Sequence, residues 1–339
     1  MKYLWAILFA LLIGCNICAY EITPDACSRA VEQAERLVGN NLEMRFSLSL
    51  GRIVWFGEKG ENLLWLNNDR EIAEYHEKFP AGYLNFGGDK VWATPQCLWS
   101  TIFEHSWPPP IALEGLPWKT VRKTARSLIV ESQPIPILNI QLVRTFILPD
   151  DAPVLIVKNT VKRISSSPYP IQLWSITQLK NPAFCVEEIQ EATKGLPPYI
   201  IYNNRLYSKP IAKRKLLRQS ICPEERGAKS GTLGRFVAAV YPDSKILLQV
   251  HAVHPSGCYP EGASVQVHTN PYYSELETLG ELYHLRPGET HENQVIWVLL
   301  SGEKAAHEEN ELYSKLTSEI EKIYVRFFRK SKESSVLLR

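Results

Sequence analysis

The sequence predicts an all-β protein, a large sandwich of mainly antiparallel strands with short N- and C-terminal helices. About twelve short strand-like runs, separated by turns, favour stacked antiparallel sheets. Trp (9), Tyr (15) and Pro (23) are plentiful and Met (2) is scarce, a mixture typical of strands and stiff loops rather than helical bundles. The 339 residues contain no internal repeat and no Gly- or Ser-rich linker. We therefore expect one large β domain.

The expected elements follow from hydrophobic periodicity. A short helix is predicted over 25–38, where Ala30, Ala34 and Leu37 share one face, and a closing helix over 303–325. Between 138 and 148, apolar residues alternate with polar ones, the period of a half-buried strand. The stretch 67–118 is predicted to be loop-rich and, because it carries four tryptophans, functional rather than disordered. The expected strands are 44–50, 52–56, 62–66, 127–131, 138–148, 154–163, 170–179, 199–202, 235–241, 245–253, 263–269, 274–279 and 292–300.

Charge and cysteine spacing exclude two classes of partner. The chain has 38 basic and 36 acidic residues, a net charge of +2, so it lacks the basic excess typical of nucleic-acid binding. The cysteines are dispersed, without a CxxC pair. We therefore expect no nucleic-acid partner, no metal and no cofactor.

The amino terminus is predicted to be a targeting segment. Residues 1–19 have a basic start and a short apolar run from Tyr3 to Ile13, as a secretory signal does. Leu12-Ile13-Gly14-Cys15 resembles a bacterial lipobox, with cleavage before Cys15 and lipidation of that residue. Ordinary cleavage after Ala19 and an uncleaved anchor are the alternatives. The expected domains are then the signal (1–19), the β domain (20–303) and a C-terminal helix with a basic tail (304–339). The expected location is the bacterial cell envelope, lipid-anchored in the outer membrane or periplasm, or the secreted fraction.

An ordered set of motifs resembles the galactose mutarotase-like superfamily, and within it an uncharacterised bacterial branch of the DUF4380 type. The set is Gly51–Val54 with Gly60–Trp65, Asn85–Gln96 with Trp107–Pro109, Trp174–Gln178, and Thr269–Pro271 with Glu275–Gly280 and Leu285–Glu289. The resemblance implies a β-supersandwich with a concave groove of the size of a sugar.

The segment Gly87–Gln96 offers what a saccharide site needs, aromatic platforms and a few directional polar groups. Its two glycines allow the backbone to approach a ligand. The candidate substrate-binding residues are Asp89, Lys90, Trp92, Gln96, Trp174 and Gln178. The alternative is structural: Trp92 in the core, and Lys90 paired with Asp89 or a glutamate.

Glu275 and Glu277 are the candidate catalytic residues. They lie two apart on a predicted strand, so they point to the same face. Two neighbouring carboxylates repel, and a raised pKa in one of them suits general acid–base chemistry. If that face is open to solvent, they are two surface glutamates. In the proteins that this chain resembles, a late-strand glutamate is the catalytic base.

The resemblance also implies an acidic His on a middle strand, and 173–179 contains none. We therefore expect an exported carbohydrate-binding protein. The alternatives are an aldose epimerase-type enzyme acting on a sugar or sugar derivative, and a non-catalytic structural envelope lipoprotein.

Overall fold

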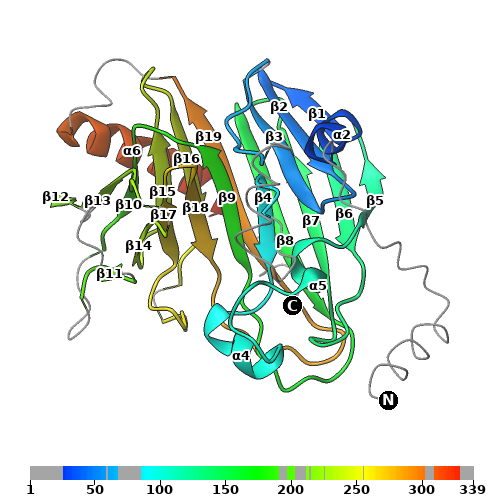
Figure 1. The fold of residues 1–339 in the computed structure, drawn as a ribbon. Helices are drawn as coiled ribbons and strands as arrows, with labels where there is room; N and C mark the ends of the chain where they lie inside the picture. Colours follow the sequence, from blue (N-terminus) through cyan, green and yellow to red (C-terminus); the bar gives the residue numbers. More distant parts are fainter. Residues whose placement is uncertain are drawn as a thin grey trace.

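Two large antiparallel sheets lie face to face in the computed structural model (Figure 1). The structure describes residues 26–58, 60–67, 85–190, 197–202, 211–213, 215–224, 226–254, 256–301 and 309–328. The predicted signal, with Cys15, and the basic tail after residue 328 lie outside these ranges. Within them, no helix is long and apolar enough to cross a membrane. The predicted all-β sandwich of antiparallel strands is confirmed.

The strand order defines the two layers. The nine-stranded sheet runs β1 (Glu35–Gly39), β2 (Leu42–Ser47), β3 (Arg52–Glu58), β4 (Asp89–Trp92), β9 (Trp174–Lys180), β18 (Tyr273–Leu279), β17 (Val265–Thr269), β14 (Ala228–Thr232), β11 (Ile200–Ile201). The ten-stranded sheet runs β12 (Ile211–Lys213), β13 (Leu216–Ser220), β10 (Phe184–Glu188), β15 (Phe236–Val240), β16 (Ile246–His251), β19 (Thr290–Leu300), β8 (Val154–Arg163), β7 (Ile140–Ile147), β6 (Ser127–Ser132), β5 (Trp118–Lys123). Since strands distant in sequence become neighbours, residues from four parts of the chain meet at the centre of the nine-stranded sheet.

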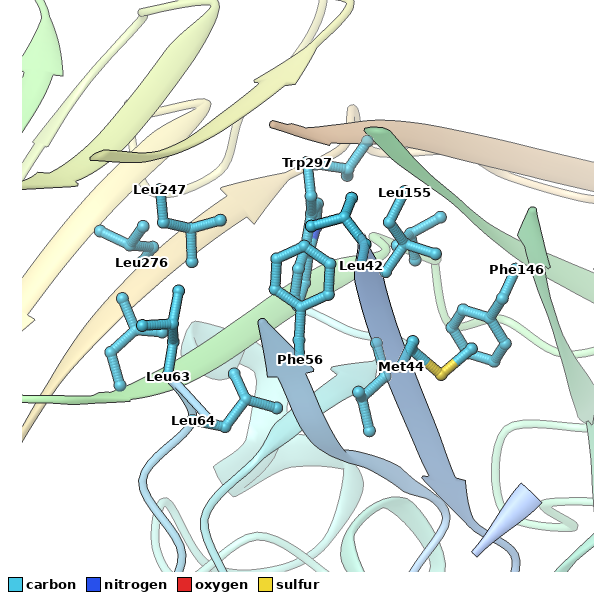
Figure 2. Packing of buried hydrophobic residues seen from close by; sticks show 14 of the residues in the cluster. Leu42, Met44, Phe56, Leu63, Leu64, Phe146, Leu155, Leu247, Leu276 and Trp297 are labelled. Atoms are coloured by element: carbon cyan, nitrogen blue, oxygen red, sulfur yellow. The ribbon is translucent and has the colours of Figure 1, made fainter. Parts of the chain in front are cut away.

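The main core fills the space between the sheets (Figure 2). Phe56 of the nine-stranded sheet meets Trp297 of the ten-stranded sheet edge to face, with ring centroids 5.0 Å apart. Met44 and Phe146 belong to the same buried cluster, and Leu276 of β18 also points into it. The inward residues of both sheets alternate with outward ones, as the period of a strand requires.

Helix α6 (Glu309–Ile323) covers the outer face of the ten-stranded sheet. Its Leu312, Leu316 and Ile320 recur at helical spacing and belong to one buried cluster with Phe236 of β15 and Leu248 of β16. A five-residue π-helical turn (Tyr324–Phe328) follows it directly. The helical segment runs to Phe328, beyond the predicted end at 325, and the predicted start at 303 lies outside the described residues.

The other helical elements are short. They are α2 (Ala26–Glu32), the 3-10 turn η1 (Gln96–Leu98), α4 (Trp99–Ile102) and α5 (Ile111–Glu114). The last three lie in the predicted loop-rich stretch, which also contains strand β4. The segment 62–66 forms isolated bridges, Leu64 with Leu179 and Leu66 with Gly87, instead of the expected strand.

The predicted first helix is wrong in its second half. It ends at Glu32, and β1 begins at Glu35. Asn40 and Asn41 have positive φ values of 48° and 64°, the backbone of a two-residue hairpin turn that matches the twist of strands. This turn folds β1 back onto β2, so pairing in the sheet overrides the helical spacing of the alanines.

Candidate functional site

The two candidate glutamates lie on the outer face of the nine-stranded sheet, the face that points away from the ten-stranded sheet. Leu276 of β18 points into the core between the sheets. Side chains alternate along a strand, so its neighbours Glu275 and Glu277 point outward. Glu277 is fully buried there, and the side chain of Glu275 is 16% exposed. Neither is an ordinary surface glutamate.

Strand register brings four more of the predicted residues to this face. Gln178 of β9 lies directly opposite Glu275. Trp92 of β4 lies opposite Trp174 of β9, and Lys90 is on the same side of β4 as Trp92. Three adjacent strands, β4, β9 and β18, therefore gather six of the eight predicted binding and catalytic residues.

Glu277 is held by one of its two oxygens. Trp174 donates its indole N–H to Oε2 at 2.8 Å, and Lys229 of β14 donates from Nζ to the same oxygen at 2.9 Å. The other oxygen, Oε1, is buried and has no hydrogen-bond partner among the described residues. The carboxyl group is therefore fixed in orientation but has one open acceptor.

Burial raises the pKa of Glu277 to about 7, and the negative charge of Glu275 adds to the shift, although Lys229 opposes it. Burial alone would lower the pKa of Lys229, but the charges of Glu277, Glu261 and Glu275 outweigh it and leave that pKa above its ordinary value. Lys229 thus stays an ammonium while Glu277 exchanges a proton near neutral pH, the range that suits a general base.

Glu275 forms a second polar pair beside Glu277. Its Oε1 accepts a hydrogen bond from Gln178 at 2.8 Å, and its Oε2 lies 3.2 Å from Nδ1 of His268 on β17. Burial acts to raise the pKa of Glu275, but His268, Lys229 and Lys90 outweigh it and lower that pKa to about 2. For His268, the carboxylate of Glu275 outweighs burial and raises the pKa. The two glutamates therefore differ in protonation near pH 6.

Three buried acceptor oxygens on this face have no donor among the described residues. They are Oε1 of Glu277, Oε1 of Gln178 and Oε1 of Gln266 on β17. The hydrogen bonds that the two amide NH2 groups donate fix the orientation of both glutamine side chains. Gln178 donates to Glu275, and Gln266 donates to Glu261 and to the Tyr202 hydroxyl, both at 2.9 Å. Because Gln266 lies opposite Glu277, the three oxygens sit on three adjacent strands.

Lys90 and Trp92 share one partner, Glu114 of helix α5. Lys90 donates from Nζ to Oε1 at 2.8 Å, and Trp92 donates its indole N–H to Oε2 at 2.8 Å. Arg52, itself fully buried, contacts the same carboxylate at 3.2 Å. Burial lowers the pKa of Lys90. This is the structural pairing with a glutamate that the sequence left open, and it anchors α5 to the sheet.

Asp89 and Gln96 are not brought together with the other predicted residues. Asp89 points to the inner side of the sheet, where one oxygen pairs with Arg144 of β7 and the other accepts a hydrogen bond from Thr177 at 2.8 Å. Since Asp89 and Lys90 are consecutive on β4, they must face opposite sides. Gln96 begins the turn η1, beyond the end of that strand.

Trp174 is the aromatic centre of the site. Its ring meets that of Trp92 edge to face at 4.9 Å, and Nζ of Lys229 lies 4.9 Å from its centroid. The same ammonium lies 5.8 Å from the ring of Tyr202. Trp174 is only 2% exposed, so it acts as a packed support of Glu277 and Lys229.

Sequence reasoning missed Lys229, His268 and Gln266. A signal existed for two of them: Val265 and Val267 alternate with Gln266 and His268, so both polar side chains share the face opposite the core. No such signal exists for Lys229, because its segment, Ala-Lys-Ser-Gly-Thr, does not alternate apolar and polar residues.

Gly227 explains how the His268 ring is seated. Gly227 has a positive φ of 67°, and a Cβ added there would lie 2.2 Å from Nε2 of His268. A side chain at 227 would therefore displace the imidazole. With Nε2 against this backbone, Nδ1 is the nitrogen that faces Glu275.

The described residues include no group of three or more His, Cys, Asp or Glu placed to hold a metal ion.

Three solved structures have a similar fold. A galactose mutarotase-like protein from Lactobacillus casei matches with a TM-score of 0.51 and 9% identity, over 79% of this chain and 100% of that one. Slr1438 from Synechocystis matches with a TM-score of 0.51 and 9% identity, over 79% and 96%. A TPR-domain containing protein from Parabacteroides distasonis matches with a TM-score of 0.51 and 14% identity, over 78% of this chain and 46% of that one.

No protein-family model matches the chain, and no curated protein matches it by sequence. The likeness therefore concerns the fold: two large antiparallel sheets with a C-terminal helix on one of them. The chain has the galactose mutarotase-like fold.

Proposed function

We propose that the protein binds a carbohydrate on the outer face of the nine-stranded sheet, around Glu277. The observation that carries the proposal is the set of three buried acceptor oxygens, of Glu277, Gln178 and Gln266, that lack donors within the part of the chain that the structure describes. A buried acceptor without a partner costs about 1–3 kcal/mol. The hydroxyl groups of a sugar are donors of the kind that these oxygens lack, and the galactose mutarotase-like fold is in keeping with such a ligand.

A second function, interconversion of the anomers of the bound sugar, is favoured by the titrating groups. Epimerase-type chemistry requires a base and an acid on one face, and 173–179 supplies no His. Glu277 supplies the base, because its pKa is raised to about 7. His268 supplies the acid, since its pKa is also raised. It lies on β17, the strand beside that of Glu277, two residues after Gln266, which is directly opposite Glu277.

The proton transfers balance without a further reactant. Oε1 of Glu277 takes the proton of the anomeric hydroxyl, the C1–O5 bond breaks as the C1–O1 carbonyl forms, and Nδ1 of His268, the nitrogen that is not packed against Gly227, gives a proton to O5. The open-chain aldehyde then rotates about C1–C2. Reclosure reverses both transfers and restores Glu277 and His268 to their starting states.

The cellular setting is part of the same proposal. The lipobox-like Leu12–Cys15 supports export and lipid anchoring, and the ordered motifs from Gly51 to Glu289 support the DUF4380 branch. A sugar-binding protein of the cell envelope is the function that joins these features.

The experiment is a screen of common aldoses against the full chain by calorimetry, followed by exchange NMR of the anomers of each sugar that binds. We expect binding of at least one sugar, its loss in Glu277→Gln, and retention in Glu292→Gln, a control glutamate on β19 of the other sheet. A sugar that binds without exchange between its anomers would support the binding function and refute the enzymatic one. A failure to bind any sugar would refute both and favour a structural envelope protein.

A further inference from the structure

We propose that Lys229 is the positioning residue that makes Oε1 of Glu277 the proton-accepting oxygen and keeps this carboxyl ionised at the pH where the site works. The inference rests on the proposed function for its biological meaning, but its test does not need a sugar. It concerns a residue that lies outside the predicted site and on a different strand from both glutamates.

The geometry treats the two oxygens of Glu277 unequally. Oε2 receives two donors, the indole N–H of Trp174 at 2.8 Å and Nζ of Lys229 at 2.9 Å, while Oε1 receives none among the described residues. Two donors, one of them charged, stabilise negative charge on Oε2. A proton therefore adds to Oε1, the oxygen that remains open.

Lys229 is itself held in place by aromatic rings. Its ammonium lies 4.9 Å from the ring centroid of Trp174 and 5.8 Å from that of Tyr202, contacts that favour a cation. Its side chain is 19% exposed, so the ion pair with Glu277 is only partly screened by water. Trp174 thus contacts both partners and fixes their separation.

Several other charged groups influence the protonation of Glu277 or of the charged residues beside it. Glu275 is on the same strand, His268 on β17, and Glu187 of β10 lies in the layer beneath. Glu261 acts on Lys229, and Lys90 of β4 acts on Glu275. Of these groups, Lys229 is the cation that directly contacts the Glu277 carboxylate in the described structure. An opposite charge at this range moves the pKa of a carboxyl by ~1–3 units.

The test is a titration of the Glu277 carboxyl in the full chain, by carbon NMR of glutamate-labelled protein, with the signal assigned by its absence in Glu277→Gln. We expect Lys229→Met to move the Glu277 titration upward by ~1–3 pH units. Lys229→Arg should restore it, since it keeps the charge. Trp174→Phe should produce a smaller shift, because it removes a neutral donor. An unchanged titration in Lys229→Met would refute the proposal.

A measurement on the wild type keeps the inference testable if Lys229→Met does not fold. The nitrogen resonance of the Lys229 ammonium should show an inflection at the pH where Glu277 titrates, and its absence would refute the proposal. A failure of this inference can also be distinguished from a failure of the proposed function. A shifted titration in a protein that binds no sugar refutes only the function, and sugar turnover with an unshifted titration refutes only the role of Lys229.

Discussion

The buried carboxyl of Glu277 should make the protein less stable as pH rises toward neutrality, and Glu277→Gln should remove this effect. Its pKa is about 7 in the folded protein against 4.5 in the unfolded chain. Between these values the folded state binds the proton more tightly, so the stabilising effect is complete below pH 4.5 and is lost as pH rises through 7. A difference of 7 − 4.5 = 2.5 units corresponds to about 3 kcal/mol in the free energy of unfolding.

The assay is urea denaturation of wild type and Glu277→Gln at pH 4.5 and pH 8. Groups that keep titrating in both proteins, such as Glu187 and His268, largely cancel in the difference. We expect the wild type to lose about 3 kcal/mol relative to the variant between the two pH values. Glu292→Gln, at a partly exposed position of the other sheet, serves as the matched control for the loss of a glutamate. If the difference between wild type and Glu277→Gln is equal at both pH values, the raised pKa of Glu277 is refuted.

Three further predictions address the other parts of the site. Lys90→Met should lower the free energy of unfolding by about 3 kcal/mol in chemical denaturation, because it breaks a buried pair with Glu114; an equally stable variant with weaker sugar binding would instead make Lys90 a ligand contact. His268→Gln should slow anomer exchange about 10²–10⁴-fold in exchange NMR while sugar affinity is retained, and an unchanged rate would remove His268 as the acid. Cys15→Ser should abolish labelling by a palmitate analogue, and labelling of the Ser variant would contradict the lipobox.

The fold was predictable because most strands have strong local periodicity. Strand β7 alternates buried and half-buried residues along its whole length, and β8 occupies the predicted 154–163 without change. Strands β4 and β10 were missed because charged residues, Asp89 and Lys90 in one and Glu187 and Glu188 in the other, interrupt their apolar runs. The equally buried strands β15 and β16 are nearly continuous apolar runs and were predicted. A strand buried on both faces is recognised by an apolar run instead of by alternation, so charged residues within it hide the signal.

The site was predictable only in part. That Glu275 and Glu277 share a face was predictable, because residues two apart on one strand necessarily do so. Asp89 and Lys90 were assigned to one site because their segment resembled a loop. The segment is instead a strand, so the two consecutive side chains face opposite sides of the sheet. Lys229 depends on the pairing of β14 with β17, a contact between residues far apart in sequence that no local pattern encodes.

Two buried carboxyl groups of this sheet show why the outer face is the better candidate for function. Asp89 and Glu277 are equally buried, but both oxygens of Asp89 have donors, from Arg144 and Thr177. Glu277 keeps Oε1 without one among the described residues, as do two neighbouring glutamines. Folded proteins satisfy most of their buried polar atoms, so an unsatisfied group demands a reason. The inner carboxyl is explained by the cohesion of the two sheets, whereas the outer one would receive its missing donors from the ligand that we propose.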